Sequence, residues 1–433
     1  MFKPNRNILI DSDNNIFIFD LTIDGNVNCK QYDSNLNLIG SNRINEATVM
    51  NYSVTIDRDN TIHLITLTNA GELHYYKYSD GKWNENTIAK FNLLSNIYNQ
   101  FEVLLINDKL HLIYNYSNLI NSNIWTIQHI VYDNGREEQY NVVRYISKKT
   151  PEPFIVDADN LGNIHLLYLN YINNSSQVYY SFYSFYGKMW NPHPKLLSSD
   201  NVNNLTPYLF IDSNNNIHCV WIEDLSYKMK LKLMKMHASG KEKYQWKEVP
   251  LPNVSISKGY PFIYETNGKL NLVLISNNKI ISLESKDYGY KWYKSEKELE
   301  FRGNMELVKL KLSPLNYPDK INLIYMEEGN DEKINILHHF LNFNSSSLKE
   351  KHDNKEISDE NNYTAILQSQ TEPELSIPSY ILDLTNKIDD LLTNQLALNA
   401  YLEKAIHSQE NIIKKLDIIE SLIKDSNSKS IWA

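Results

Sequence analysis

Residues 8–19 read ILIDSDNNIFIF, and the same pattern returns along the chain as far as residue 325. It consists of an apolar strand, a turn rich in Asp and Asn, and a second apolar strand that begins with Ile or Leu. It recurs as VTIDRDNTIHLI (54–65), VLLINDKLHLIY (103–114), FIVDADNLGNIHLLY (154–168), YLFIDSNNNIHCVW (208–221), FIYETNGKLNLVL (262–274) and KLSPLNYPDKINLIY (311–325). The leading Ile or Leu falls at positions 16, 62, 110, 164, 217, 270 and 321, so successive units begin 46–54 residues apart.

A period near 50 residues, with room for two further strands in each unit, is typical of the four-stranded blades of a β-propeller. We therefore expect an all-β, seven-bladed propeller over residues 1–351. The predicted blades are about 7–50, 51–99, 100–150, 151–204, 205–258, 259–304 and 305–351. An open β-solenoid is the alternative, but its repeat is usually shorter.

Composition excludes several classes of protein. The 433 residues are 42% hydrophobic, which is enough for a sizeable core, although the length alone suggests two to four domains. We find no apolar run long enough for a membrane span and no secretory leader, and therefore expect synthesis in the cytoplasm. The two cysteines, Cys29 and Cys219, are too few for a disulfide framework. No basic stripe favours nucleic-acid binding.

One turn in the sixth repeat carries a known signature. Ser285, Asp287, Gly289 and Trp292 fit the pattern S-x-D-x-G-x-x-W, and eroded versions stand at 79–83 and 187–190. The first 350 residues thus resemble the sialidase-like superfamily of propellers, whose Asp boxes have this pattern. The resemblance implies a folding device in which Asp and Ser cap a turn and Trp is buried. The turn pattern by itself marks a fold and does not identify a ligand.

The same resemblance predicts what a sialidase would need, namely three arginines on the inner strands for a substrate carboxylate. The chain has only six arginines (Arg6, Arg43, Arg58, Arg136, Arg144 and Arg302), and none falls within the inner strands inferred from the repeat. Glu102, Glu265 and Glu306 are the carboxylates available on inner strands for other glycosidase chemistry. We therefore predict no catalytic residues and a protein that is not an enzyme.

Two further patterns raise the question of a metal site. His63, His111, His165 and His218 share one register in four repeats, but equivalent positions on neighbouring blades are on the order of 10 Å apart. A zinc ion needs donors near 2 Å from one point, so we expect packing or turn bonding instead. Asp11-x-Asp13-x-Asn15 and Asp212-x-Asn214-x-Asn216 resemble the start of a calcium loop without its Gly and Glu. No metal and no cofactor are predicted.

The chain also contains 30 tyrosines, most of which suit strands. Tyr171, Tyr186 and Tyr288 are the candidates for a binding face, since we expect them in loops. Amphipathic rings of this kind suit both sugars and protein interfaces.

The C-terminal part differs from the repeats. All 13 glycines precede residue 330, and residues 352–433 hold 14 acidic but only 7 basic residues. We expect a polar linker at 352–378, a coiled-coil helix at 379–426 and a short tail at 427–433. The heptad core consists of Ile381, Leu384, Ile388, Leu391, Gln395, Leu398, Leu402, Ala405, Gln409, Ile412, Leu416, Ile419 and Ile423. Extra apolar residues at e positions favour a homotrimer or homotetramer, although a helix folded back on the ring is an alternative.

Together these patterns favour a non-enzymatic binding or scaffold protein. Its propeller head would bind a protein or glycan ligand, and its helix would multiply weak contacts through multimerisation. A component of a spore coat or a phage-like particle, exposed on the spore surface or virion after assembly, is the biological setting that we hypothesise. The alternative is a carbohydrate-binding lectin or a sialidase-like glycosidase.

Overall fold

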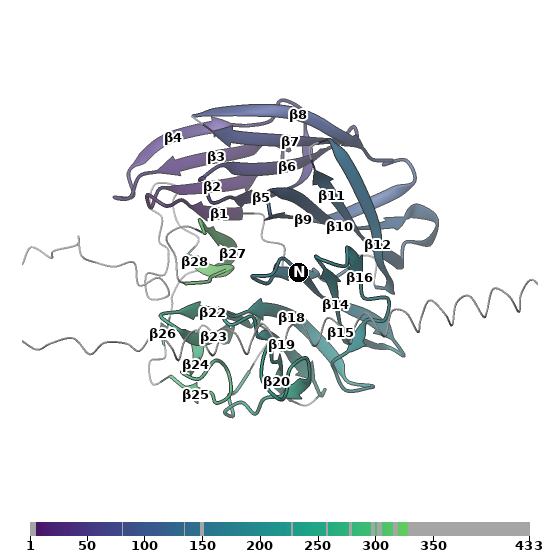
Figure 1. Ribbon diagram of the computed structural model, residues 1–433, viewed down its shortest axis with the longest axis vertical. Helices are drawn as coiled ribbons and strands as arrows, with labels where there is room; N and C mark the ends of the chain where they lie inside the picture. Colours follow the sequence, from purple (N-terminus) through teal and green to yellow (C-terminus); the bar gives the residue numbers. More distant parts are fainter. Residues whose placement is uncertain are drawn as a thin grey trace, which may run out of the picture. The chain divides into compact units, whose positions relative to one another are not determined.

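The structure, a computed structural model, describes residues 6–327 except 80, 134, 148–150, 227, 257–258, 277–278, 296–298, 301–304 and 315–318. These residues form antiparallel blades and one short 3-10 helix, η1 (Leu119–Asn121) (Figure 1). The first three blades contain β1 (Arg6–Ile10), β2 (Ile16–Leu21), β3 (Val27–Tyr32), β4 (Leu38–Arg43); β5 (Val49–Ile56), β6 (Ile62–Thr68), β7 (Glu72–Ser79), β8 (Lys82–Lys90); and β9 (Asn96–Ile106), β10 (Lys109–Asn118), β11 (Ile124–Asp133), β12 (Arg136–Ile146).

The remaining strands continue the same order. They are β13 (Ile155–Ala158), β14 (Ile164–Ile172), β15 (Ser175–Ser184), β16 (Met189–Trp190), β17 (Lys195–Leu196); β18 (Asn203–Ile211), β19 (Ile217–Asp224), β20 (Met229–Met236), β21 (Trp246–Glu248); β22 (Phe262–Thr266), β23 (Lys269–Ser276), β24 (Lys279–Ser285), β25 (Tyr293–Lys294), β26 (Leu299–Glu300); and finally β27 (Met305–Leu312) and β28 (Leu323–Glu327). The fold is therefore an all-β propeller, as the repeat predicts.

The number of blades differs from the prediction. The described strands form six sheets, not seven. The seventh repeat, expected at 305–351, contributes β27 and β28, and β27 pairs in parallel with β1 over Asn7–Lys309 to Ile10–Leu312. Figure 1 shows this pair beside the first blade. Because the pairing joins strands about 300 residues apart, no local pattern could predict it, and the prediction of a separate seventh blade is wrong.

The burial of the strands follows from the stacking of the sheets. The second strand β6 is buried at every position, including His63, Thr66 and Thr68, because other sheets cover both of its faces. The outermost strand β4 is exposed at nearly every position; its second half is polar, whereas Leu38 and Ile39 are exposed apolar residues.

Clusters of buried apolar side chains fill the spaces between neighbouring sheets. One cluster joins Leu9 of β1 to Val54 of β5, and similar clusters follow around the ring. The cluster that closes the ring brings Ile10 of β1 together with Leu272 of β23 and Leu310 of β27. The sixth sheet therefore packs against the first, and a closed ring needs no free sheet face.

The chain divides into two units, residues 1–349 and 350–433. The predicted linker at 352–378, the coiled-coil helix at 379–426 with its heptad residues, and the tail at 427–433 all lie outside the described residues. These assignments stay predictions.

Candidate functional site

A cavity of about 580 Å³ lies where the first strands of the blades meet. Its wall includes Asn7 of β1, Thr55 of β5, Glu102 of β9, Asp157 of β13, Leu209 of β18 and Tyr260, two residues before β22. Every blade therefore contributes to the wall, which places the cavity on the axis of the ring. The wall combines apolar side chains with amides, carboxylates and lysines. The volume of the cavity falls within the range of roughly 300–1,000 Å³ that is common for small-molecule sites.

Glu102 is held by an ion pair that crosses the cavity. Lys309 of β27 reaches its carboxylate from the first sheet, and the Gln100 side chain donates to the same Oε1 at 2.8 Å. The amide of Gln100 also bonds the backbone of Phe154 in the fourth sheet, at 2.8 Å through its nitrogen and 3.1 Å through its oxygen. Glu102 is thus a fixed, charge-compensated group rather than a free carboxylate.

Asp157 is held by a second pair of this kind. Lys320, in the segment between β27 and β28, lies 2.9 Å from its Oδ2, and the Ile211 N–H donates to the same oxygen at 3.2 Å. The Asn322 amide lies 3.4 Å away, and the Ala158 N–H donates to Oδ1 at 2.9 Å. Donors therefore occupy both carboxylate oxygens.

Lys311 is the third lysine on the cavity wall, and its surroundings differ. Its ammonium group donates to the Val103 carbonyl at 2.9 Å, and none of the described carboxylates lies within 4 Å of it. Burial lowers the pKa of Lys311 to about 8, an effect that Glu102 and Asp157 partly oppose and that Lys309 increases. At neutral pH this lysine is still mostly charged.

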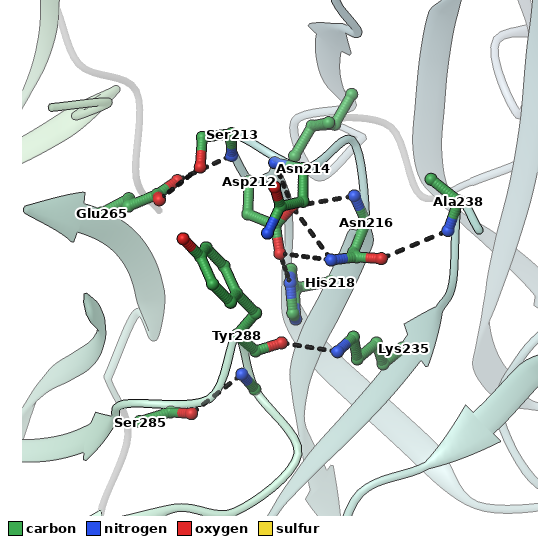
Figure 2. Close-up of polar contacts among 12 residues, drawn as sticks. Asp212, Ser213, Asn214, Asn216, His218, Lys235, Ala238, Glu265, Ser285 and Tyr288 are labelled. Carbon is green, nitrogen blue, oxygen red and sulfur yellow. Dashed lines mark hydrogen bonds and ion pairs between the residues drawn. The ribbon is translucent and has the colours of Figure 1, made fainter. Parts of the chain in front are cut away.

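The three glutamates that the sequence placed on inner strands do not converge. Glu102 lines the cavity, whereas Glu306 lies 3.4 Å from Arg6. Glu265 is 1% exposed and accepts hydrogen bonds from the Ser213 N–H at 2.7 Å and hydroxyl at 2.6 Å, as Figure 2 shows. It therefore fastens the turn of the fifth blade to the sixth. Arg6 corrects a prediction, because it is the first residue of β1, where the repeat had placed no arginine.

The register of histidines is explained by the turns. His63, His165 and His218 each lie near the turn aspartate six residues earlier, with Nε2–Oδ2 distances of 3.0 Å to Asp57, 3.4 Å to Asp159 and 2.9 Å to Asp212. His111 follows a turn without this aspartate, and its Nδ1 lies 2.9 Å from Nε2 of His129. This arrangement fits the turn-bonding interpretation, and the described residues include no group of three or more His, Cys, Asp or Glu that could hold a metal ion.

The segments that resemble a calcium loop are Asx turns. Oδ1 of Asp11 accepts hydrogen bonds from the backbone N–H groups of Asp13 at 2.9 Å and Asn15 at 2.8 Å. Asp212 bonds Asn214 and Asn216 in the same way, as seen in Figure 2. The carboxylate thus satisfies the donors of its own turn.

The predicted Asp-box residues form the turn between β24 and β25. The Ser285 hydroxyl donates to Asp287 at 2.8 Å and accepts from the Gly289 N–H at 2.8 Å, and Trp292 is 5% exposed. The turn packs on the fifth blade, where Lys235 donates to the Tyr288 carbonyl at 2.5 Å (Figure 2). These contacts describe a structural turn away from the axial cavity, and membership of the Asp-box superfamily stays a prediction.

The three tyrosines proposed as a binding face lie on two blades. Tyr171 belongs to strand β14, not to a loop as predicted. Tyr186 is 81% exposed in the turn before β16, and Tyr288 is half-buried in the turn before β25. None of the three lines the axial cavity.

Sequence reasoning missed the lysines. It searched the inner strands for arginines and acids, whereas the cations on the wall are Lys309, Lys311 and Lys320. A signal was present, because Val308-Lys309-Leu310-Lys311-Leu312 alternates strictly between apolar residues and lysine. That alternation predicts one face with two lysines on an inner strand.

Among the described residues, no helix is long and apolar enough to cross a membrane. No known protein family and no curated protein matches the sequence.

Solved structures with a similar fold include lectins and glycosidases. A lectin from Aleuria aurantia in complex with Fucα1-6GlcNAc is 12% identical, with a TM-score of 0.39, over 67% of this chain and 94% of the lectin. An α-L-arabinanase from Penicillium chrysogenum complexed with arabinobiose is 10% identical, with a TM-score of 0.41, over 64% of this chain and 93% of that one. A protein of unknown function from Dyadobacter fermentans is 8% identical, with a TM-score of 0.43, over 63% of this chain and 90% of that protein. At these identities the likeness concerns the propeller fold alone.

Proposed function

We propose that the propeller is a non-enzymatic binding head that holds a carbohydrate ligand in its axial cavity. The observation that carries this proposal is the chemistry of the wall. Lysine and amide donors line the space together with apolar and aromatic residues such as Leu104 and Tyr260, and sugars combine hydroxyl groups with apolar faces that match both.

The state of the carboxylates supports binding rather than hydrolysis. Glycoside hydrolysis commonly needs one carboxylic acid that gives a proton and a second carboxylate that acts as base or nucleophile. Glu102 accepts from Lys309 and Gln100, and Asp157 accepts from Lys320 and backbone N–H groups. Both carboxylates are therefore engaged by donors of the protein, whereas a general acid must reach the glycosidic oxygen of a bound sugar.

Calorimetric titration of the full chain with a panel of mono- and disaccharides tests the proposal. Asn51 lines the cavity and Asn86 is exposed on β8 of the same blade, so Asn51→Trp should abolish binding while Asn86→Trp should leave it unchanged. Binding that survives in Asn51→Trp would place the ligand elsewhere. Cleavage of any bound sugar, detected by chromatography of the reaction mixture, would contradict the non-enzymatic assignment.

The predicted C-terminal helix adds multivalency to this proposal. Several heads on one multimer would bind a repetitive glycan surface more tightly than one head does, through effective concentration. A scaffold role in a spore coat or phage-like particle would use the same arrangement.

A further inference from the structure

The seventh repeat turns one strand face toward the axial cavity. Side chains alternate between the two faces of a strand, so Lys309 and Lys311 of β27 and Ser313, directly after it, lie on the same side. All three residues line the cavity. The parallel pairing with β1 and the hydrogen bond from the Ser313 N–H to the Ile10 carbonyl, 2.8 Å, fix this face in place.

The two acids whose charges act on Lys311 are each paired with another lysine. Glu102 of β9 is paired with Lys309, and Asp157 of β13 is paired with Lys320. Asp319, the other carboxylate on the wall, accepts the Asn267 N–H at 2.8 Å. Lys311 has three N–H donors, and its only contact within the described residues is the Val103 carbonyl. Two donors of a charged group therefore remain for a ligand.

Ser313 supplies a second unsatisfied group. Its side chain is fully buried, and its hydroxyl has no hydrogen-bond partner among the described residues. A buried hydroxyl without a partner is costly, on the order of 1–3 kcal/mol, unless a ligand or a water bonds it. Ser313 and Lys311 thus place an unpartnered hydroxyl and an ammonium group in one part of the cavity wall.

We infer that Lys311 and Ser313 form an anion subsite that binds the carboxylate of a sugar acid. This inference rests on the proposed function, since it specifies the ligand of the same cavity. Lys311 is the one lysine of the described wall without a paired acid. A single negative charge therefore matches it better than a phosphate monoester, which carries about −1.5 to −2 at neutral pH.

Titration of the full chain with D-glucuronate and D-glucose at pH 7 tests the subsite. We expect glucuronate to bind about tenfold more tightly than glucose, which corresponds to one charge-assisted contact. Lys311→Gln should lower glucuronate binding to about the level of glucose and should have a smaller effect on glucose binding. Ser313→Ala should lower glucuronate binding several-fold. Lys230→Gln, which changes an exposed residue of β20, is the matched control.

A pH series on the unmodified chain gives a second readout that needs no substitution. Burial lowers the pKa of Lys311 to about 8, so the preference for glucuronate should be present at pH 7 and lost as pH rises above that value. Lys309, Glu102 and Asp157 are the charged groups that face Lys311. Glucose binding should not change between pH 7 and 9.5.

The possible outcomes separate the two proposals. Equal binding of glucuronate and glucose, unchanged in Lys311→Gln and across the pH series, overturns the anion subsite and leaves the carbohydrate function standing. Acetate that binds through Lys311 in an NMR titration, with no sugar bound, keeps the subsite and overturns the carbohydrate function. If neither acetate nor any sugar binds, both proposals are wrong.

Discussion

At Gly289, backbone conformation and packing both require a glycine. Its φ is +83°, which L side chains rarely adopt, and a Cβ atom there would lie 2.6 Å from Cε1 of His218. His218 belongs to the fifth blade and Gly289 to the sixth, so the missing side chain allows two blades to approach each other. Gly135 has the same φ of +83°, but a Cβ there would have no neighbour within 4 Å.

We therefore predict that Gly289→Ala destabilises the protein more than Gly135→Ala. Both substitutions should incur the left-handed backbone penalty of roughly 1–2 kcal/mol, and only Gly289→Ala should add an overpacking penalty of roughly 1–3 kcal/mol. Urea unfolding of the two variants measures the difference directly. Equal free energies of unfolding would mean that the turn moves away from His218 without penalty.

The turn between the first and second strands is the element that repeats most faithfully. In the fifth blade, Asp212 is 2% exposed and bonds two backbone N–H groups, the Asn216 amide and His218. Asp33, between β3 and β4, makes the same turn with Asn35 and Asn37 at the surface, without a histidine. One local motif therefore serves both a buried and an exposed hairpin.

Asp212→Ala should destabilise the protein by about 3 kcal/mol, because it leaves buried donors of the turn and of His218 without an acceptor. Asp33→Ala should have a smaller effect, since water can replace its carboxylate. Thermal unfolding of both variants, compared with the unmodified chain, provides the measurement. A similar loss in both would show that burial of the turn is unimportant.

The contact between the third and fourth blades includes a buried chain of polar groups. Nε1 of Trp190 can only donate, and it lies 3.2 Å from Nδ1 of His129. Nε2 of His129 must then carry the proton that bonds His111, and both histidines are neutral. Burial lowers the pKa of His111 to about 4 and that of His129 well below its usual value.

This pair predicts acid sensitivity of the ring. The unfolded histidine takes up a proton near pH 6.5 and the folded His111 only near pH 4, so stability is present above pH 6.5 and is lost as pH falls between these values. The loss for one such group is about 3 kcal/mol. Urea unfolding from pH 7.5 to 4.5 should show a smaller loss in His111→Leu than in the control His193→Leu, whose histidine is exposed. Equal pH profiles would contradict this account.

The predicted heptads imply an oligomeric state for the full chain. Light scattering of the full chain should give the mass of a trimer or tetramer. Replacing Leu391 and Leu398, both at d positions, by Glu should give a monomer, because charges in the core of a coiled coil are strongly unfavourable. Thr393→Glu, at an outer f position, should not change the mass. A monomeric full chain would show that the apolar stripe has another partner.

The accuracy of the sequence predictions depended on the range of the interactions involved. The β-propeller class, the inner strands and the Asx turns were predictable, since each depends on residues close together in the chain, as in Asp212 and His218. The ion pairs of the cavity were not, because Lys309 and Glu102 are separated by 207 residues. The expectation that Tyr171 lies in a loop was wrong because strand β14 continues through it to Ile172.

The sequence by itself determined that this chain forms hairpins of about 50 residues per unit, with buried second strands and polar outer ones. Those features depend on side-chain alternation and on turns that bond themselves. Only the tertiary structure decided that seven repeats make six sheets, because the edge of β1 is free to accept β27 in parallel. It alone decided the candidate site as well, since the lysines of the seventh repeat reach across the ring axis to carboxylates of the third and fourth blades.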